Sequence, residues 1–204
     1  MQNFTRVAEN LDTRPVLNEL ASSPGAWDVD TSRQRNVRCQ RHTRNIFLRA
    51  PVKPLPPGEK NSNNVHDSRL TRQARYFPQT LALCRAVARQ RGGDLGRAVL
   101  VALLPMRKVS PHVDLGEYYR IRDRFHLVLA SLRGSPVTVG DETVIMHLGE
   151  LWAFDNKKCH WAWNPSDEPR VHLIFDVLPP PGQGLYVYPI LGSQDDTARV
   201  AATA

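Results

Sequence analysis

The pattern of apolar and polar positions predicts two helices in the N-terminal half of the chain. The first begins after Asp12 or Thr13, which can cap it, and ends at the Ser-Ser-Pro-Gly run over 22–25. The second covers residues 78–91 and ends at a pair of glycines. Their apolar positions are Val16, Leu17 and Leu20 in the first helix and Leu81, Cys84 (or Leu83), Val87 and Ala88 in the second. Each set fits one buried face of a helix.

The rest of the chain has the pattern of β structure. Short apolar runs are separated by turn residues such as Gly134 and Gly140. The predicted strands are 43–48, 97–104, 118–122, 124–130, 137–139, 143–148, 151–154, 160–163 and 170–177. Many short strands with helices confined to one half favour a mainly β fold. We predict a double-stranded β-helix (jelly roll) with flanking N-terminal helices.

Length and composition predict one soluble domain. With 204 residues, we expect a single domain over 1–191 and a frayed polar tail over 192–204. No apolar run approaches the length of a membrane span, and the N-terminus lacks a signal pattern, so we expect a cytoplasmic protein without a membrane partner. The three cysteines have no CxxC spacing, which argues against a disulfide framework and a cysteine-bound zinc.

Part of the net charge of +7 comes from an arginine cluster over 33–49. Its members are Arg33, Arg35, Arg38, Arg41, Arg44 and Arg49. The cluster fits a solvated face, a positive cleft mouth that attracts an acidic small molecule or peptide, or a nucleic-acid footprint. No nucleic-acid-binding motif accompanies it, so a nucleic acid is the least favoured partner.

The candidate chemistry begins with His112 and Asp114. Side chains at positions i and i+2 of an extended strand point to the same face, so this imidazole and this carboxylate can reach one point. His160, from another predicted strand, can complete a set of three. Two histidines and one carboxylate on one face of a metal form the facial triad of non-haem Fe(II) oxygenases.

Arg170 opens a strand that is otherwise mostly apolar, Arg-Val-His-Leu-Ile-Phe-Asp-Val. An arginine that enters a barrel interior needs an anionic partner, because an unpaired buried charge is costly. A bidentate arginine–carboxylate pair suits one end of a dicarboxylic keto acid.

Four stretches over about 97–178 resemble the aspartyl/asparaginyl β-hydroxylase family of Fe(II)/2-oxoglutarate dioxygenases, which includes bacterial free-proline hydroxylases. They are PHVD at 111–114, RFHLVL at 124–129, LWAFDNKKCHWAWN at 151–164 and RVHLIFDV at 170–177. The resemblance implies a jelly-roll catalytic core. Eukaryotic peptide-hydroxylating members lack the carboxylate ligand, so the presence of Asp114 makes this chain more similar to the bacterial members.

The resemblance also implies roles for single residues. His112, Asp114 and His160 match the metal ligands, and Arg170 matches the arginine that pairs with the distal carboxylate of 2-oxoglutarate. Arg124 and His126 match a pair that lines the co-substrate pocket. One polar residue of that pocket has no counterpart here, because the preceding strand is apolar.

The implied activity uses Fe(II), 2-oxoglutarate and O₂. It hydroxylates an unactivated C–H of an amino acid, an amino-acid-derived metabolite or a peptidyl Asp, Asn or Pro residue, and releases succinate and CO₂. We expect a small-molecule or peptidyl substrate that carries a carboxylate, and the sequence leaves the oligomeric state open. The alternatives are a jelly-roll metal-dependent hydrolase or isomerase, which has no use for Arg170 as an anchor, and a non-catalytic basic binding module.

Overall fold

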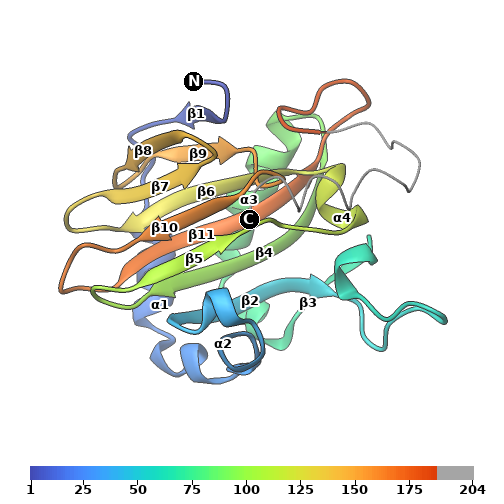
Figure 1. The fold of residues 1–204 in the computed structure, drawn as a ribbon. Coiled ribbons are helices and arrows are strands. Elements are labelled where there is room, and N and C mark those ends of the chain that lie inside the picture. The colour runs from blue at the N-terminus through green and yellow to red at the C-terminus, as the bar shows by residue number, and fades with distance from the viewer. Residues whose placement is uncertain (188–204) are drawn as a thin grey trace.

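Two antiparallel β-sheets face each other in the computed structural model of the chain, which describes residues 1–187 (Figure 1). The larger sheet has the strand order β1-β9-β6-β11-β4-β2-β3, and the smaller sheet has the order β5-β10-β7-β8. The strands of the larger sheet are β1 (Phe4–Ala8), β2 (Thr43–Pro51), β3 (Ser68–Leu70), β4 (Asp94–Leu103), β6 (Asp123–Ala130), β9 (Leu151–Phe154) and β11 (Arg170–Leu178). Those of the smaller sheet are β5 (Lys108–His112), β7 (Ser135–Val139), β8 (Glu142–Met146) and β10 (His160–Trp163). The predicted mainly β jelly roll is confirmed.

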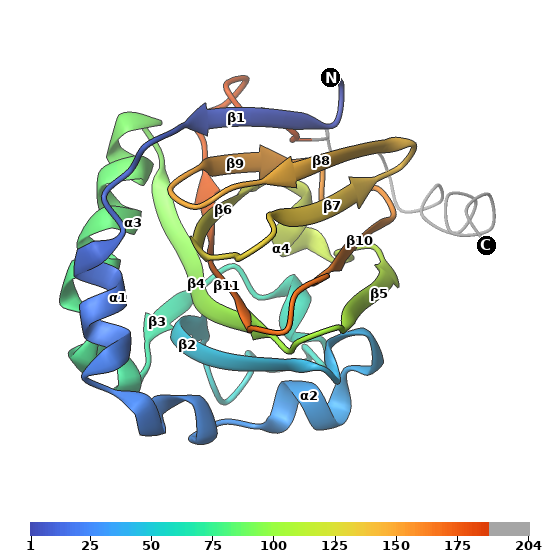
Figure 2. The same ribbon diagram turned by 90° about the vertical axis from the view of Figure 1, so that its left-hand side faces the viewer.

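The helices α1 (Arg14–Ala21) and α3 (Pro78–Gln90) cover the outer face of the larger sheet, as Figure 2 shows. Both predicted helices are therefore present, with ends close to the expected ones. Their apolar positions, among them Val16, Leu81 and Cys84, pack against strand residues such as Leu100 and Phe175 in the main hydrophobic core. This core fixes the larger sheet as a rigid platform.

The inner face of the larger sheet is partly polar. Along β11, Leu173 and Phe175 belong to the helix-side core, whereas Arg170, His172 and Asp176 lie at alternate positions. Because successive side chains of a strand point to opposite faces, these three polar residues face the smaller sheet. A second apolar cluster, which includes Val137 and Phe154, packs between the sheets beside them. The polar residues therefore lie inside the barrel.

The strand predicted over 118–122 is wrong, because residues Glu117–Arg120 form the short helix α4. Gly116 has a φ of +118° and turns the chain before it. The Tyr118 ring then lies between two guanidinium groups, with the Cζ atoms of Arg97 and Arg122 at 3.8 and 4.1 Å from its centroid. These tertiary cation–π contacts outweigh the β-propensity of the tyrosines.

Three strands were not predicted, namely β1, β3 and β5. β1 and β3 are edge strands whose sequences lack a clear alternation, and β5 includes Pro111. The arginine cluster divides between the helix α2 (Ser32–Asn36), the 3₁₀ helix η2 (Arg38–Gln40) and β2. The predicted tail over 192–204 lies outside the described residues. No helix in the described part of the chain has the length and hydropathy needed to span a bilayer.

Candidate active site

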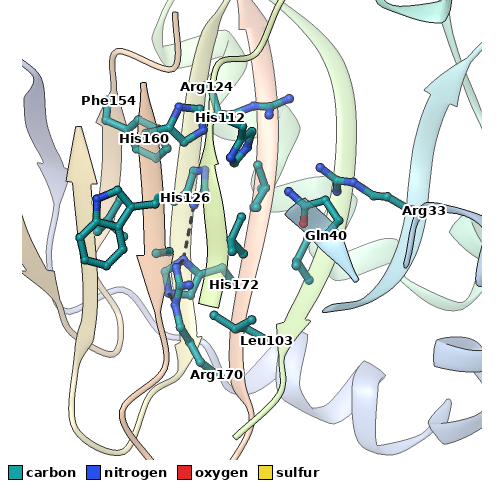
Figure 3. A pocket seen from close by; sticks show the side chains of 16 residues that line it. Arg33, Gln40, Leu103, His112, Arg124, His126, Phe154, His160, Arg170 and His172 are labelled. Atoms are coloured by element: carbon teal, nitrogen blue, oxygen red, sulfur yellow. Dashed lines mark hydrogen bonds between the residues drawn. The ribbon is translucent and has the colours of Figure 1, made fainter. Parts of the chain in front are cut away.

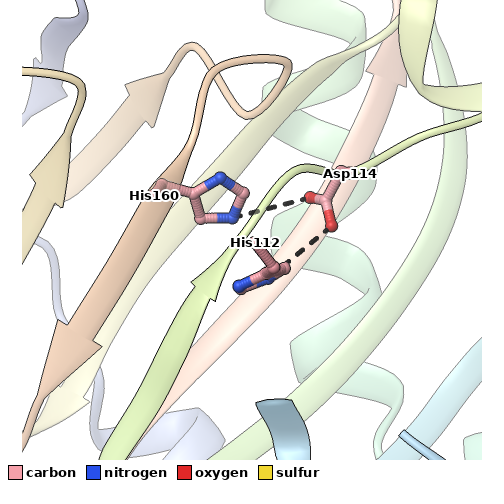
Figure 4. Close-up of side chains that lie close together, drawn as sticks. All are labelled: His112, Asp114 and His160. Carbon is pink, nitrogen blue, oxygen red and sulfur yellow. Dashed lines mark ion pairs between the residues drawn. The ribbon is translucent and has the colours of Figure 1, made fainter. Parts of the chain in front are cut away.

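His112, Asp114 and His160 come together between the sheets (Figure 4). One ligand atom from each residue lies within 4.8 Å of the others. The two histidines are direct register partners on the neighbouring strands β5 and β10, and their ring centroids are 4.3 Å apart. Asp114 follows the end of β5, so its carboxylate reaches the imidazoles from a loop rather than from the strand itself. This set of two imidazoles and one carboxylate can hold a metal ion.

Backbone carbonyls orient both imidazoles in the same way. Nδ1 of His112 lies 2.8 Å from the carbonyl oxygen of Ser110, and Nδ1 of His160 lies 2.9 Å from that of Lys158. A carbonyl only accepts a hydrogen bond, so each Nδ1 carries a proton and Nε2 is the ring nitrogen that can bind a metal. Both Nε2 atoms lie 3.9 Å from carboxylate oxygens of Asp114. Burial lowers the pKa of His160 to about 4, which keeps its ring neutral and able to bind a metal.

The Asp114 carboxylate is held by two donors. Nη1 of Arg124 donates to Oδ2 at 2.6 Å, and the side-chain amide of Asn156 donates to the same oxygen at 2.9 Å. Burial by itself would raise the pKa of Asp114, but Arg124 and the two imidazoles hold that pKa well below its usual range. The carboxylate is therefore ionised, as a metal ligand must be.

Arg124 bridges two carboxylates. Its Nε and Nη2 donate to the two oxygens of Asp176 at 2.8 and 3.0 Å, while Nη1 donates to Asp114. Asp176 is the direct register partner of Arg124 across β6 and β11. Arg124 lines the cavity, as the sequence prediction requires, but its guanidinium is already paired with protein carboxylates.

Arg170 lies in the same cavity, toward the end opposite His112 and His160 (Figure 3). It is 6% exposed, and no acidic side chain of residues 1–187 lies within ion-pair distance of it. Its Nε and Nη2 lie 3.1 Å from the two ring nitrogens of His172. Burial alone lowers the pKa of Arg170 to about 9. Arg170 is thus a buried cation whose neighbours do not neutralise it.

His126 and His172 lie between the two ends of the cavity (Figure 3). Their Nδ1 atoms are 3.4 Å apart. Burial lowers the pKa of each well below the usual value, and neighbouring arginines lower it further, so both rings are neutral. Nε2 of His126 is buried without a hydrogen-bond partner within the described residues. An unpaired buried nitrogen is costly, so this atom marks a place for a ligand group.

All six residues predicted for the site line the cavity or adjoin it. Two contributors were not predicted from the sequence, namely Asp176 and Asn156. Asp176 offered a signal, because it shares the strand face of Arg170 and His172, whereas Asn156 acquires its place only through tertiary packing. Of the arginine cluster over 33–49, Arg33 lines the cavity, which agrees with a positive cleft mouth as one of the alternatives for that cluster.

The fold and the site define a jelly-roll protein with a candidate metal centre beside a basic cavity. Residues 61–180 match the family described as Aspartyl/Asparaginyl beta-hydroxylase. That match covers more than half of the chain, so the chain belongs to the aspartyl/asparaginyl β-hydroxylase family. No curated protein matches the chain.

Solved structures provide a second comparison. An oxidoreductase of the 2OG-Fe(II) oxygenase family from Burkholderia pseudomallei is 10% identical with a TM-score of 0.52, over 84% of this chain and 82% of the other. A prolyl-4-hydroxylase from Pseudomonas putida is 14% identical with a TM-score of 0.50, over 87% of this chain and 93% of the other. At these identities the likeness shows a common fold.

Proposed function

We propose that this protein is an Fe(II)- and 2-oxoglutarate-dependent dioxygenase that hydroxylates an unactivated C–H bond of a carboxylate-bearing amino acid or related molecule. The observation that carries the proposal is the layout of the cavity. Two imidazoles and an ionised carboxylate converge at one end, and a buried guanidinium without an acidic partner among residues 1–187 lies toward the other.

The donor set fits a divalent metal and a dicarboxylic acid. His112 and His160 present Nε2 nitrogens, and Asp114 supplies the single negative charge of a facial triad. Arg170 is buried without an acidic partner in the described part of the chain, which a protein tolerates poorly unless a ligand supplies the charge. The distal carboxylate of 2-oxoglutarate meets that need with a bidentate pair. A hydrolase with the same triad has no use for this anchor.

Iron and 2-oxoglutarate, when bound, supply the oxidative chemistry, in which O₂, the keto acid and the substrate C–H give succinate, CO₂ and the alcohol. The chain itself binds and orients the metal and the keto acid, and it excludes water from the cavity. His112, Asp114 and His160 hold the metal, and Arg170 fixes the far end of the keto acid. His126 offers its Nε2 nitrogen, which has no hydrogen-bond partner within the described residues, to a polar group of the keto acid. Apolar side chains such as Val137, Phe154 and Ile174 line the remainder and keep it dry.

Arg124 and Asn156 act as positioning residues in this proposal. Their hydrogen bonds to Oδ2 of Asp114 fix the carboxylate before the metal arrives. The Asp176 carboxylate offsets the charge of Arg124, so the pair adds rigidity without adding a free cation to the cavity.

The test is succinate production by the pure protein with Fe(II), ascorbate and 2-oxoglutarate, with and without a panel of free amino acids. We expect at least one amino acid to stimulate succinate formation in step with its own hydroxylation. The matched control is His112→Ala, which removes one imidazole from a half-buried position at a strand end. If neither protein forms succinate under any condition, or if His112→Ala matches the wild type, the proposal fails.

A further inference from the structure

A third guanidinium enters the cavity from outside the family-matched segment. Arg33 belongs to α2, whereas the match begins at residue 61. Figure 3 shows its side chain reaching toward the cavity beside Gln40, on the side where His112 lies. Gln40 belongs to η2, which packs against β5, the strand that ends in His112. This wall therefore borders the metal end of the cavity.

Arg33 is positioned by a neutral group. Its Nη1 donates to Oδ1 of Asn45 at 3.3 Å, and the buried Asn45 is itself fixed by a bond from its amide to Thr43. No acidic side chain of the described chain lies within ion-pair distance of Arg33, and its Nε and Nη2 have no hydrogen-bond partner there. Two donors of the guanidinium fork are thus available to a ligand.

Gln40 supplies a further donor at the same wall. It is 6% exposed, and both of its oxygen atoms accept from the Thr43 hydroxyl, the backbone oxygen at 2.8 Å and Oε1 at 3.4 Å. The side-chain amide of Gln40 also forms a hydrogen bond with Cys39, which leaves one of its two N–H groups for a ligand. A guanidinium fork beside an amide N–H is a donor set suited to a carboxylate.

The charges of the cavity leave one cation over. The three arginines that line it and a divalent metal carry five positive charges, and Asp114, Asp176 and the dianion 2-oxoglutarate carry four negative ones. Arg124 is paired with the two aspartates, and the keto acid faces the metal and Arg170. Asp114 attracts Arg33 only from beyond ion-pair distance and is already paired with Arg124, so the unmatched positive charge falls on Arg33. A backbone carbonyl of a peptide substrate does not neutralise it.

We propose that Arg33, assisted by Gln40, binds the free carboxylate of the substrate, so that this protein acts on a small carboxylic acid of the amino-acid type and not on an internal residue of a peptide. The proposal rests on the proposed function. It makes the segment Ser32–Gln40, outside the family match, the element that determines substrate specificity.

The test measures binding and not turnover. Anaerobic protein with Fe(II) is titrated calorimetrically with 2-oxoglutarate, and then with each of the free amino acids and the carboxamide of every one that binds. We expect at least one acid to bind and its amide to bind about 30-fold more weakly, because a charged hydrogen-bonded pair is lost. In Arg33→Gln the acid loses about the same factor, the amide keeps its affinity, and 2-oxoglutarate binds as in the wild type.

The controls come from the same helix. Arg35 is exposed in α2, so Arg35→Gln changes the same charge and leaves acid binding unchanged. Arg33→Lys keeps the charge without the fork and is expected to restore part of the affinity. A thermal melt by circular dichroism checks that each variant is folded.

Four results overturn the inference alone, provided that 2-oxoglutarate binds. The first two are the absence of binding by any free amino acid and equal binding of acids and amides. The other two are unchanged acid affinity in Arg33→Gln and equal affinity for the same residue within a peptide blocked at both ends. If the wild type does not bind 2-oxoglutarate, the proposed function fails as well, so the two failures are distinguishable.

Discussion

Arg124 and Arg170 line the same cavity, and their electrostatic environments are opposite. Arg124 touches two carboxylates, and although burial disfavours its charge, Asp114 and Asp176 raise its pKa well above the usual value. Within residues 1–187 the only hydrogen-bond partner of Arg170 is the neutral ring of His172, and burial lowers the pKa of Arg170 to about 9. Both side chains are largely buried.

The difference separates two uses of a buried cation. A guanidinium with its charge satisfied by the protein organises the site, since it fixes the carboxylate that binds the metal. A guanidinium without an anionic partner keeps an unfavourable desolvation free energy, which an anionic ligand can offset. The contrast therefore assigns positioning to Arg124 and ligand binding to Arg170, which the sequence alone treats as two members of one pocket.

The largest expected effect is on folding. Arg124→Leu leaves the buried Asp176 and the mostly buried Asp114 without their cation, and we expect a loss of about 3–5 kcal/mol in the free energy of unfolding. Arg170→Leu removes an unpaired buried charge, so the metal-free protein should keep its stability to within about 1 kcal/mol or gain some. Urea unfolding of both variants measures this, and equal losses would refute the contrast.

A pH titration sharpens the same comparison. The pKa of His160 is about 4 in the folded protein against 6.5 when exposed, so the unfolded chain binds more protons between these values. The free energy of unfolding of the metal-free protein should fall from pH 6.5 to pH 4, by up to about 3 kcal/mol from His160 alone. His126 and His172, with lowered pKa values, act in the same direction.

Asp114, at the Arg124 end of the cavity, loses its contribution to stability in a more acidic pH range. The pKa of Asp114 is lowered, so its stabilisation is present above the usual aspartate pKa and is lost only at more acidic pH. His160→Asn should flatten the fall between pH 6.5 and pH 4 and leave the acidic limb below pH 4 in place. An unchanged slope in that variant would show that burial of the imidazole does not control stability there.

Ligand binding is the third way to test the contrast. Arg170→Leu should weaken the binding of 2-oxoglutarate by about 30-fold, equivalent to about 2 kcal/mol. The reason is that one carboxylate of the ligand loses its charged partner. Metal affinity should not change, because Arg170 contacts none of the three candidate ligands. Separate calorimetric titrations with the metal and with 2-oxoglutarate measure the two affinities. Parallel losses of both would remove Arg170 from its proposed role.

The sequence predicted elements with a regular apolar period better than elements without one. The helices α1 and α3 and the strand β11 have a regular apolar period, so their local pattern and their tertiary environment agree. The segment α4 was predicted as a strand because its packing against Arg97 and Arg122 is invisible in a local pattern. The edge strand β1 is fixed by β9, from the distant C-terminal half of the chain, and β3 is fixed by β2 across the loop over 52–67.

For the candidate site, sequence spacing predicted one contact, whereas the other contacts depend on strand register, which a local pattern does not show. His112 and Asp114 are close in sequence, so their proximity was predictable. The approach of His160 depends on the pairing of β10 with β5, and the pairing of Arg124 with Asp176 depends on the register of β6 against β11. Arg33 reaches the cavity because α2 packs against β2, whose Asn45 accepts a hydrogen bond from its guanidinium. No local pattern records such contacts between distant segments.

The smallest expected effect concerns Asn156, the second donor to Asp114. Asn156→Ala removes the amide hydrogen bond to Oδ2 and leaves the stronger bond from Arg124, so the carboxylate is still ionised but less rigidly held. We expect metal affinity to fall by about 10-fold, the lower end of the range for partners that orient metal ligands. Affinity for 2-oxoglutarate at saturating metal should not change, because the altered contact belongs to the Arg124 end. A loss of 2-oxoglutarate binding at saturating metal would mean that the two ends of the cavity are not independent.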